Sequence, residues 1–335
     1  MTTEEIEVAA AQLQLAEPRP QGLEEQELLL QCKLYPYGFP MEVKTNSAEI
    51  IALLTDMLGA FEKCFDVEPI RAEIRVVETE SNECPPPPAY RQTYPIFTAV
   101  ADKDNYLILH FPTRRSYMTL SSAAMQHEPY LRFFFMESIA GVHLGTSYAT
   151  ALHAGFVSLE GTGVLLCGDS GAGKSTLTYA CARSGWKYVT DDCSFLLHNE
   201  ERNLVTGNCY RVRFRPSAAS LFPEVAGKEL TDRAGGKPSI ELPTTDLPDI
   251  VPSHMEEVRY MVFLNRHSDG PHELVPYSKD AARTFLRSYI SGTGETLLKH
   301  SQAVERLLAV DILELRYTDL DWAIERLRTL VQEGR

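Results

Sequence analysis

The sequence predicts an α/β protein in which a phosphate-binding core follows a smaller α+β module. Two observations predict the core: residues 168–175 read GDSGAGKS, which fits the pattern G-x-x-x-x-G-K-[ST], and an apolar run and a helix-forming segment flank them. A third observation predicts the module, because residues 28–112 alternate strand-like runs with one helical stretch. We therefore expect three parts: an acidic, disordered tail at 1–25, the α+β module at 26–113 and the P-loop core at 114–335.

The composition favours a soluble protein with reduced thiols. Of the 335 residues 44% are hydrophobic, and no apolar run reaches the about 20 residues that span a bilayer. The net charge of −14 argues against nucleic acid and anionic membrane surfaces as partners, because clustered Lys and Arg bind both. The seven cysteines lack C-x-x-C spacing, and the N-terminus is acidic where a signal peptide is basic. We expect a cytoplasmic protein; whether it forms a homo-oligomer stays open.

In the module, the segment 47–65 is predicted to be a helix. Ser47 is a candidate N-cap, and Ile50 and Leu54 belong to a core-facing apolar stripe. Residues 1–25 are rich in Glu, Ala and Gln, a composition that does not bury enough apolar surface to order itself.

Each residue type in the glycine-rich loop has a chemical reason. Glycines let the loop adopt positive φ, so that backbone N–H groups form an anion-binding nest at a helix N-terminus. Lys174 would reach the outer phosphates, and the Ser175 hydroxyl is placed to hold Mg²⁺ between the β and γ phosphates. A strand at 164–167 and a helix at 174–183 supply the required flanks. The expected nucleotide site comprises Gly168, Asp169, Ser170, Gly171, Ala172, Gly173, Lys174, Ser175 and Thr176.

The chain is predicted to return to the loop after this helix. Ser184-Gly185 predicts the helix end, and residues 186–190 read as a strand that runs back. About ten helical residues descend roughly 15 Å and about five extended residues climb roughly 16 Å, so Asp191 and Asp192 return to the level of the phosphates. Strand alternation points their side chains to opposite faces, so we expect them to have different roles. The alternative is that both only end a strand or pair with nearby arginines.

His153 is a candidate site residue because of a predicted hairpin. A tight turn at 160–163 would join the strands 154–159 and 164–167, and pairing residue 159 with residue 164 sets His153 beside the loop. A single histidine is more often structural than catalytic, and the spacing leaves both roles open.

These spacings resemble the catalytic domain of HPr kinase/phosphorylase, a bacterial protein-serine kinase. That family carries a histidine fifteen residues before its GDSGxGKS loop and an Asp-Asp pair seventeen residues after the lysine, as His153 and Asp191 do here. The sequence is also similar, more distantly, to ATP-dependent phosphoenolpyruvate carboxykinase. A Glu-x-Arg-Gly motif of the kinases is absent, because residues 211–217 read RVRFRPS at the corresponding distance. The overall pattern looks more like the HPr-kinase-related proteins.

The resemblance implies an ATP- and Mg²⁺-dependent kinase with a mixed sheet, which transfers the γ-phosphoryl group to a hydroxyl, such as a serine of a protein. It implies catalytic roles for Asp191, Lys174 and His153, with Asp191 orienting or deprotonating the acceptor and His153 supporting the site. Asp192 would join Ser175 around the metal. The acceptor stays unidentified, and two other classes stay open: a nucleotide-dependent binding module without transferase activity, and a small-molecule kinase.

The sequence also suggests basic side chains for the site and predicts further helices and strands. Arg211, Arg213 and Arg215 alternate along one strand face, which is either a solvated edge or a phosphate contact, and we assign Arg213 and Arg215 to the nucleotide site. Lys237 stands in a glycine-rich loop that either closes over the γ-phosphate or is an ordinary surface loop. The remaining expected elements are strands at 195–197, 259–264 and 312–317 and helices at 128–143, 281–290 and 319–330, the last capped by Thr318.

Overall fold

The computed structural model describes residues 2, 4–5, 28–198, 201–231, 238–267, 269–290, 292 and 294–334. These residues divide into two compact units, of which the first ends at His143 and the second begins at Leu144. Most of the tail predicted at 1–25 lies outside the described residues, and so does Lys237.

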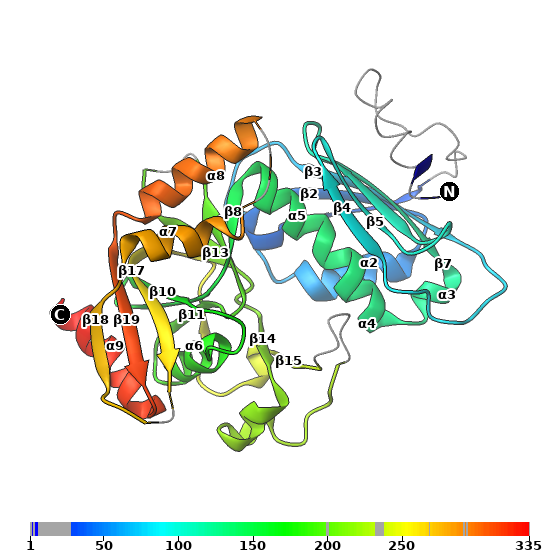
Figure 1. The fold of residues 1–335 in the computed structure, drawn as a ribbon. Helices are drawn as coiled ribbons and strands as arrows, with labels where there is room; N and C mark the ends of the chain where they lie inside the picture. Colours follow the sequence, from blue (N-terminus) through cyan, green and yellow to red (C-terminus); the bar gives the residue numbers. More distant parts are fainter. Residues whose placement is uncertain are drawn as a thin grey trace. The chain divides into compact units, whose positions relative to one another are not determined.

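The N-terminal unit is built on a seven-stranded mixed sheet (Figure 1). Its order is β1 (Leu30–Leu34), β2 (Met41–Thr45), β3 (Ile70–Val77), β7 (Arg115–Ser121), β6 (Tyr106–His110), β5 (Ile96–Val100) and β4 (Ala89–Thr93). β2, β3 and β7 run parallel to one another, while the remaining neighbours are antiparallel. The α+β character predicted for this module is therefore present.

The helix α2 (Ala48–Leu58) connects β2 to β3. Ser47 caps it as predicted, because its side chain accepts a hydrogen bond from the Ile50 N–H at 3.4 Å. Ile50 and Leu54 are fully buried, which confirms the predicted core-facing stripe. The helix ends at Leu58, seven residues before the predicted end at Phe65.

The end of this unit differs from the boundary expected at residue 113. β7 pairs with both β3 and β6, so residues 115–121 complete the N-terminal sheet and do not open the core. After them follow α3 (Ser122–Met125), α4 (Glu128–Leu131), a π-helical turn (Arg132–Met136) and α5 (Glu137–Ser147). The predicted helix at 128–143 is thus present and continues to Ser147.

The C-terminal unit contains a ten-stranded mixed sheet organised around the long strand β17 (Met255–Arg266). The first residues of β17 pair antiparallel with β13, and the remaining ones pair in parallel with β10 and β19. The other strands are β8 (Ala149–His153), β9 (Gly155–Leu159), β10 (Thr162–Cys167), β11 (Lys187–Thr190), β12 (Cys193–Leu197), β13 (Leu204–Gly207), β16 (Val251–Pro252), β18 (Glu273–Pro276) and β19 (Asp311–Tyr317). A separate two-stranded sheet pairs β14 (Arg211–Phe214) with β15 (Ile240–Pro243).

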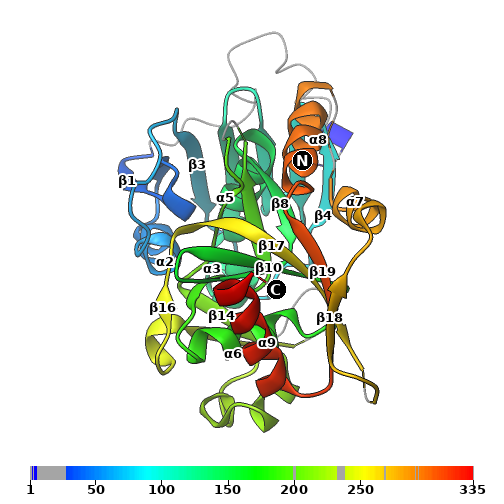
Figure 2. The same ribbon diagram turned by 90° about the vertical axis from the view of Figure 1, so that its left-hand side faces the viewer.

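Helices cover both faces of this sheet (Figures 1 and 2). α7 (Lys279–Arg287) and α8 (Gly294–Leu307) share one buried apolar cluster with Leu165 and Cys167 of β10. α6 (Lys174–Arg183) and α9 (Leu320–Glu333) pack against each other. Because strand side chains alternate, Val164 and Leu166 point to the other face, where α6 follows β10. The mixed sheet expected from the antiparallel hairpin is confirmed.

Two helices differ from the sequence expectations. Asp319, and not Thr318, caps α9, because its Oδ1 accepts a hydrogen bond from the Trp322 N–H at 2.6 Å. α8 was not predicted, although its buried residues Ala303, Val304 and Leu307 follow helical spacing. Among the described residues, no helix is both long enough and apolar enough to cross a membrane.

Candidate phosphate-binding site

The loop between β10 and α6 has the backbone of an anion nest. Gly168, Gly171 and Gly173 have φ values of 149°, 93° and 96°, a region that favours glycine. α6 begins at Lys174 directly after Gly173. Within the described part of the chain, the N–H groups of Gly171, Gly173 and Lys174 have no backbone acceptor. These donors are therefore open to an anion at the helix N-terminus, as the sequence predicts.

Lys174 is held inside this loop. Only 6% of the residue is exposed, and its Nζ donates to the carbonyl oxygens of Gly168 at 2.7 Å and Asp169 at 3.1 Å. Burial lowers the pKa of the ammonium group, and the strongest opposing influence is the negative charge of Asp192. An ammonium has three donors, so one remains for a phosphate oxygen.

The hairpin before the loop exists, but its register differs from the prediction. Leu159 pairs with Thr162 and not with Val164, because the turn is only two residues long. Glu160 and Gly161 both have positive φ, which is the signature of a tight hairpin turn.

His153 reaches the site by another route. It is the last residue of β8 and pairs with Cys193 of β12, while Ala154 separates β8 from β9. The hairpin pairing that was predicted to set His153 beside the loop is therefore wrong, because His153 is outside the β9–β10 hairpin. The pairing with β12 instead places His153 next to Asp192, the residue before Cys193.

Asp191 is the buried member of the aspartate pair. It is 4% exposed, its Oδ1 accepts a hydrogen bond from the Tyr188 hydroxyl at 2.9 Å, and its Oδ2 accepts one from the Arg213 N–H at 3.4 Å. The Ser175 hydroxyl donates to its backbone oxygen at 3.4 Å. Burial, assisted by the charge of Asp192, raises the pKa of the Asp191 carboxyl to about 6.

Asp192 is the accessible member of the pair. Its side chain is 41% exposed, and its two oxygens have different partners. Oδ1 lies 3.1 Å from Nδ1 of His153, and Oδ2 accepts a hydrogen bond from a terminal nitrogen of Arg213 at 3.0 Å. The chain thus returns both aspartates to the loop. Their environments differ as predicted, but residues 191–192 form a bend between β11 and β12, so strand alternation is not the cause.

The three arginines also have different environments. Arg213 bridges two acids, because its Nε lies 3.5 Å from Glu241 while its other end binds Asp192. Arg211 is partly buried on the same strand face, and Arg215 is exposed just after β14. Arg213 is therefore a member of the row that contacts an aspartate of the site.

Sequence reasoning missed three residues around the aspartates. Tyr188 binds Asp191, Glu241 binds Arg213, and the Tyr289 ring centroid lies 5.8 Å from that of His153. Tyr188 was readable as a neighbour on the return strand, since it stands three residues before Asp191. Glu241 and Tyr289 come from distant segments, and no local pattern in the sequence links them to the site.

The donors at the site fit a metal that is bound together with a phosphate. Among the described residues, no group of three or more His, Cys, Asp or Glu side chains could hold a metal ion. A hard cation such as Mg²⁺ usually takes one or two protein oxygens and completes its shell with phosphates and water. Ser175 and one of the two aspartates would supply that number of oxygens.

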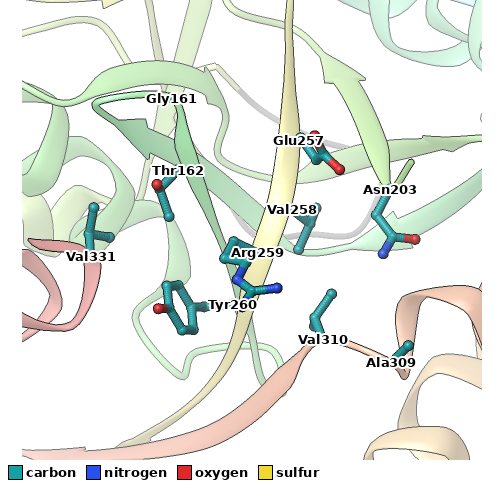
Figure 3. A pocket seen from close by; sticks show the side chains of 10 residues that line it. All are labelled: Gly161, Thr162, Asn203, Glu257, Val258, Arg259, Tyr260, Ala309, Val310 and Val331. Carbon is teal, nitrogen blue, oxygen red and sulfur yellow. The ribbon is translucent and has the colours of Figure 1, made fainter. Parts of the chain in front are cut away.

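One cavity lies away from this loop (Figure 3). It has a volume of about 470 Å³ and is lined by residues such as Thr162, Val258 and Val310, which stand at or near the amino ends of β10, β17 and β19. The phosphate loop follows the carboxyl end of β10. This cavity therefore belongs to the opposite edge of the sheet.

Comparisons with known proteins give a distant structural similarity. No family model and no curated protein sequence matches the chain. A solved structure, the HPr(Ser) kinase/phosphatase from Coxiella burnetii, is similar at 17% identity over 56% of this chain and 96% of that chain, with a TM-score of 0.28.

Proposed function

We propose that this protein is an ATP- and Mg²⁺-dependent phosphotransferase that moves the γ-phosphoryl group to a hydroxyl, a serine of a protein in the first instance. The observation that carries the proposal is that an open anion nest and the accessible carboxylate of Asp192 occur at the same site. Phosphoryl transfer depends mainly on positioning and on neutralising phosphate charge, and the nest and Lys174 supply both.

The environments of the aspartates favour an exchange of the roles implied by the resemblance. A group that takes the proton of an acceptor hydroxyl must come within hydrogen-bond distance of it, and only Asp192 is accessible enough. His153 would orient that carboxylate from 3.1 Å. Asp191 is buried against Ser175 and Tyr188, a position suited to supporting the metal side of the nucleotide.

Mg²⁺ bound with the nucleotide would neutralise part of the phosphate charge. Ser175 and Asp191 are the residues proposed to face it. Arg213 would leave Asp192 for a phosphate oxygen when the nucleotide enters, because a guanidinium binds phosphate and carboxylate with the same geometry.

The ion pair between Arg213 and Asp192 also supports a second candidate. If it stays closed, Asp192 cannot serve an acceptor, and the protein would bind nucleotide as a regulatory module without transferase activity. A metabolite acceptor remains compatible with the same residues.

Labelled γ-phosphate decides among these functions. Purified protein is incubated with a cell lysate, Mg²⁺ and γ-labelled ATP, and the protein and small-molecule fractions are counted separately. The proposal is supported if lysate protein becomes labelled with the wild type and does not with Asp192→Asn. If a small molecule other than released phosphate becomes labelled, the protein is a metabolite kinase. Nucleotide binding without label transfer to either fraction would overturn the transferase assignment.

A further inference from the structure

Another cavity, of about 360 Å³, adjoins the phosphate loop. The loop contributes Gly173 and Thr176 to its wall, whereas His153, Asp191, Asp192 and Arg213 do not line it. A phosphate chain on the nest therefore has two distinct ends, one at the aspartates and one at this cavity.

The cavity is preformed, and its wall is built from segments that are distant in the sequence. Arg266 ends β17, Tyr317 ends β19, and Leu221 follows a short 3-10 helix at 216–220. Tyr317 is 2% exposed, and its hydroxyl would lie 3.2 Å from a Cβ at position 173, so it reaches the backbone of the loop. A volume in this range is typical of small-molecule pockets.

Two charged side chains of the cavity have no partner among the described residues. Arg266 forms no hydrogen bond or ion pair there, and neither does Asp321 in the first turn of α9. Leu221 adds an apolar side chain that is 44% exposed. An apolar wall, a guanidinium and a carboxylate suit a flat aromatic base joined to a sugar, because guanidinium planes stack on rings and carboxylates accept hydrogen bonds from sugar hydroxyls.

We propose that this cavity binds the nucleoside part of the nucleotide, a purine ribonucleoside, with the base against Leu221 and Arg266 and the ribose hydroxyls on Asp321. The inference rests on the proposed function, since it assumes phosphates on the nest. It orients the nucleotide: the α-phosphate lies near Thr176, and the γ-phosphate lies near Asp192.

Calorimetry with two ligands tests the proposal. Mg-ATP and Mg-tripolyphosphate are titrated into wild type, Leu221→Ala, Asp321→Ala and the control Leu230→Ala, which removes a similarly exposed leucine outside the cavity. We expect each cavity variant to weaken the binding of Mg-ATP by about tenfold, as the loss of one good contact does. Tripolyphosphate should bind Leu221→Ala as wild type, and Asp321→Ala equally or more tightly, because an acidic group near the polyanion is removed. Leu230→Ala should change neither.

Different results would contradict the nucleoside assignment and the proposed function. If wild type binds tripolyphosphate and ATP equally and the cavity variants change neither, the nucleoside assignment is overturned and the phosphate site stands. Equal weakening of both ligands by a cavity variant also overturns it. If wild type binds neither ligand, the proposed function itself fails.

Discussion

Nδ1 of His153, the last residue of β8, lies 3.1 Å from Oδ1 of Asp192, which stands in the bend between β11 and β12. The contact follows from the antiparallel pairing of β8 with β12, in which His153 is opposite Cys193. It holds the one accessible carboxylate of the aspartate pair beside the phosphate loop. The local chemistry of the site therefore depends on a long-range strand pairing.

His153→Ala should impair transfer far more than folding. Loss of His153 removes one of the contacts that orient the Asp192 carboxylate, and we expect the transfer rate to fall about 10- to 100-fold. The cost in unfolding free energy should stay below about 1 kcal/mol, because both side chains are more than one-third exposed. Transfer assays and urea unfolding measure the two effects, with His127→Ala, a partly buried histidine of the N-terminal unit, as the control. A rate equal to wild type would remove His153 from the mechanism.

The two aspartates should separate binding from transfer. Asp192→Asn is expected to lose at least about 10²-fold in transfer while Mg-ATP affinity changes little, because the carboxylate serves the acceptor. Asp191→Asn is expected to weaken nucleotide binding only when Mg²⁺ is present. Calorimetry with and without Mg²⁺, beside a transfer assay, measures both. The opposite pattern would restore the roles that the resemblance implies.

Tyr188→Phe should destabilise the fold through Asp191. The fully buried Tyr188 hydroxyl donates to the Asp191 carboxylate, and its loss leaves a buried charge with one hydrogen bond fewer. We expect a loss of about 1–3 kcal/mol at pH 7.5, and a further rise in the pKa of Asp191. Tyr210→Phe is the control, because the Tyr210 hydroxyl bonds a histidine ring nitrogen instead of a carboxylate. Equal losses in urea unfolding would argue against a special role for Asp191.

Acid should weaken the C-terminal unit through His198. Nε2 of this buried ring bonds Thr150 at 3.0 Å, and burial, assisted by the positive charges of His300, Lys299 and Arg306, lowers its pKa to about 3. The unfolded state takes up its proton near pH 6.5, so stability falls as pH falls below that value, by about 2 kcal/mol at pH 5. His198→Gln should flatten the pH dependence of the unfolding free energy between pH 7 and 5. An unchanged slope would contradict the assignment.

Local patterns predicted the secondary structure around the glycine-rich loop well. The loop, the helix from Lys174 to Arg183 and the returning strand depend on glycine φ preference, helix spacing and chain length, which the sequence displays directly. Long-range pairing could not be predicted in the same way, because no local pattern indicates that His153 pairs with β12 or that Glu241 lies beside Arg213.

Burial was the other property that the sequence did not predict. Both aspartates look alike in the sequence, and only the packing of Tyr188 and Ser175 makes Asp191 the inaccessible one. The module boundary failed for a similar reason, since nothing local in residues 115–121 shows that they pair with β3 and β6.

Thermal unfolding with Mg-ATP tests the central claim, nucleotide binding on the loop, most directly. A ligand that binds only the native state stabilises it, by about 2.7 kcal/mol at one hundred times the dissociation constant. We predict a clear rise in the Tm of wild type at millimolar Mg-ATP, the same rise in Lys299→Ala on α8, and almost none in Lys174→Ala, whose ammonium group is lost from the nest. A wild-type Tm that Mg-ATP leaves unchanged would contradict the account.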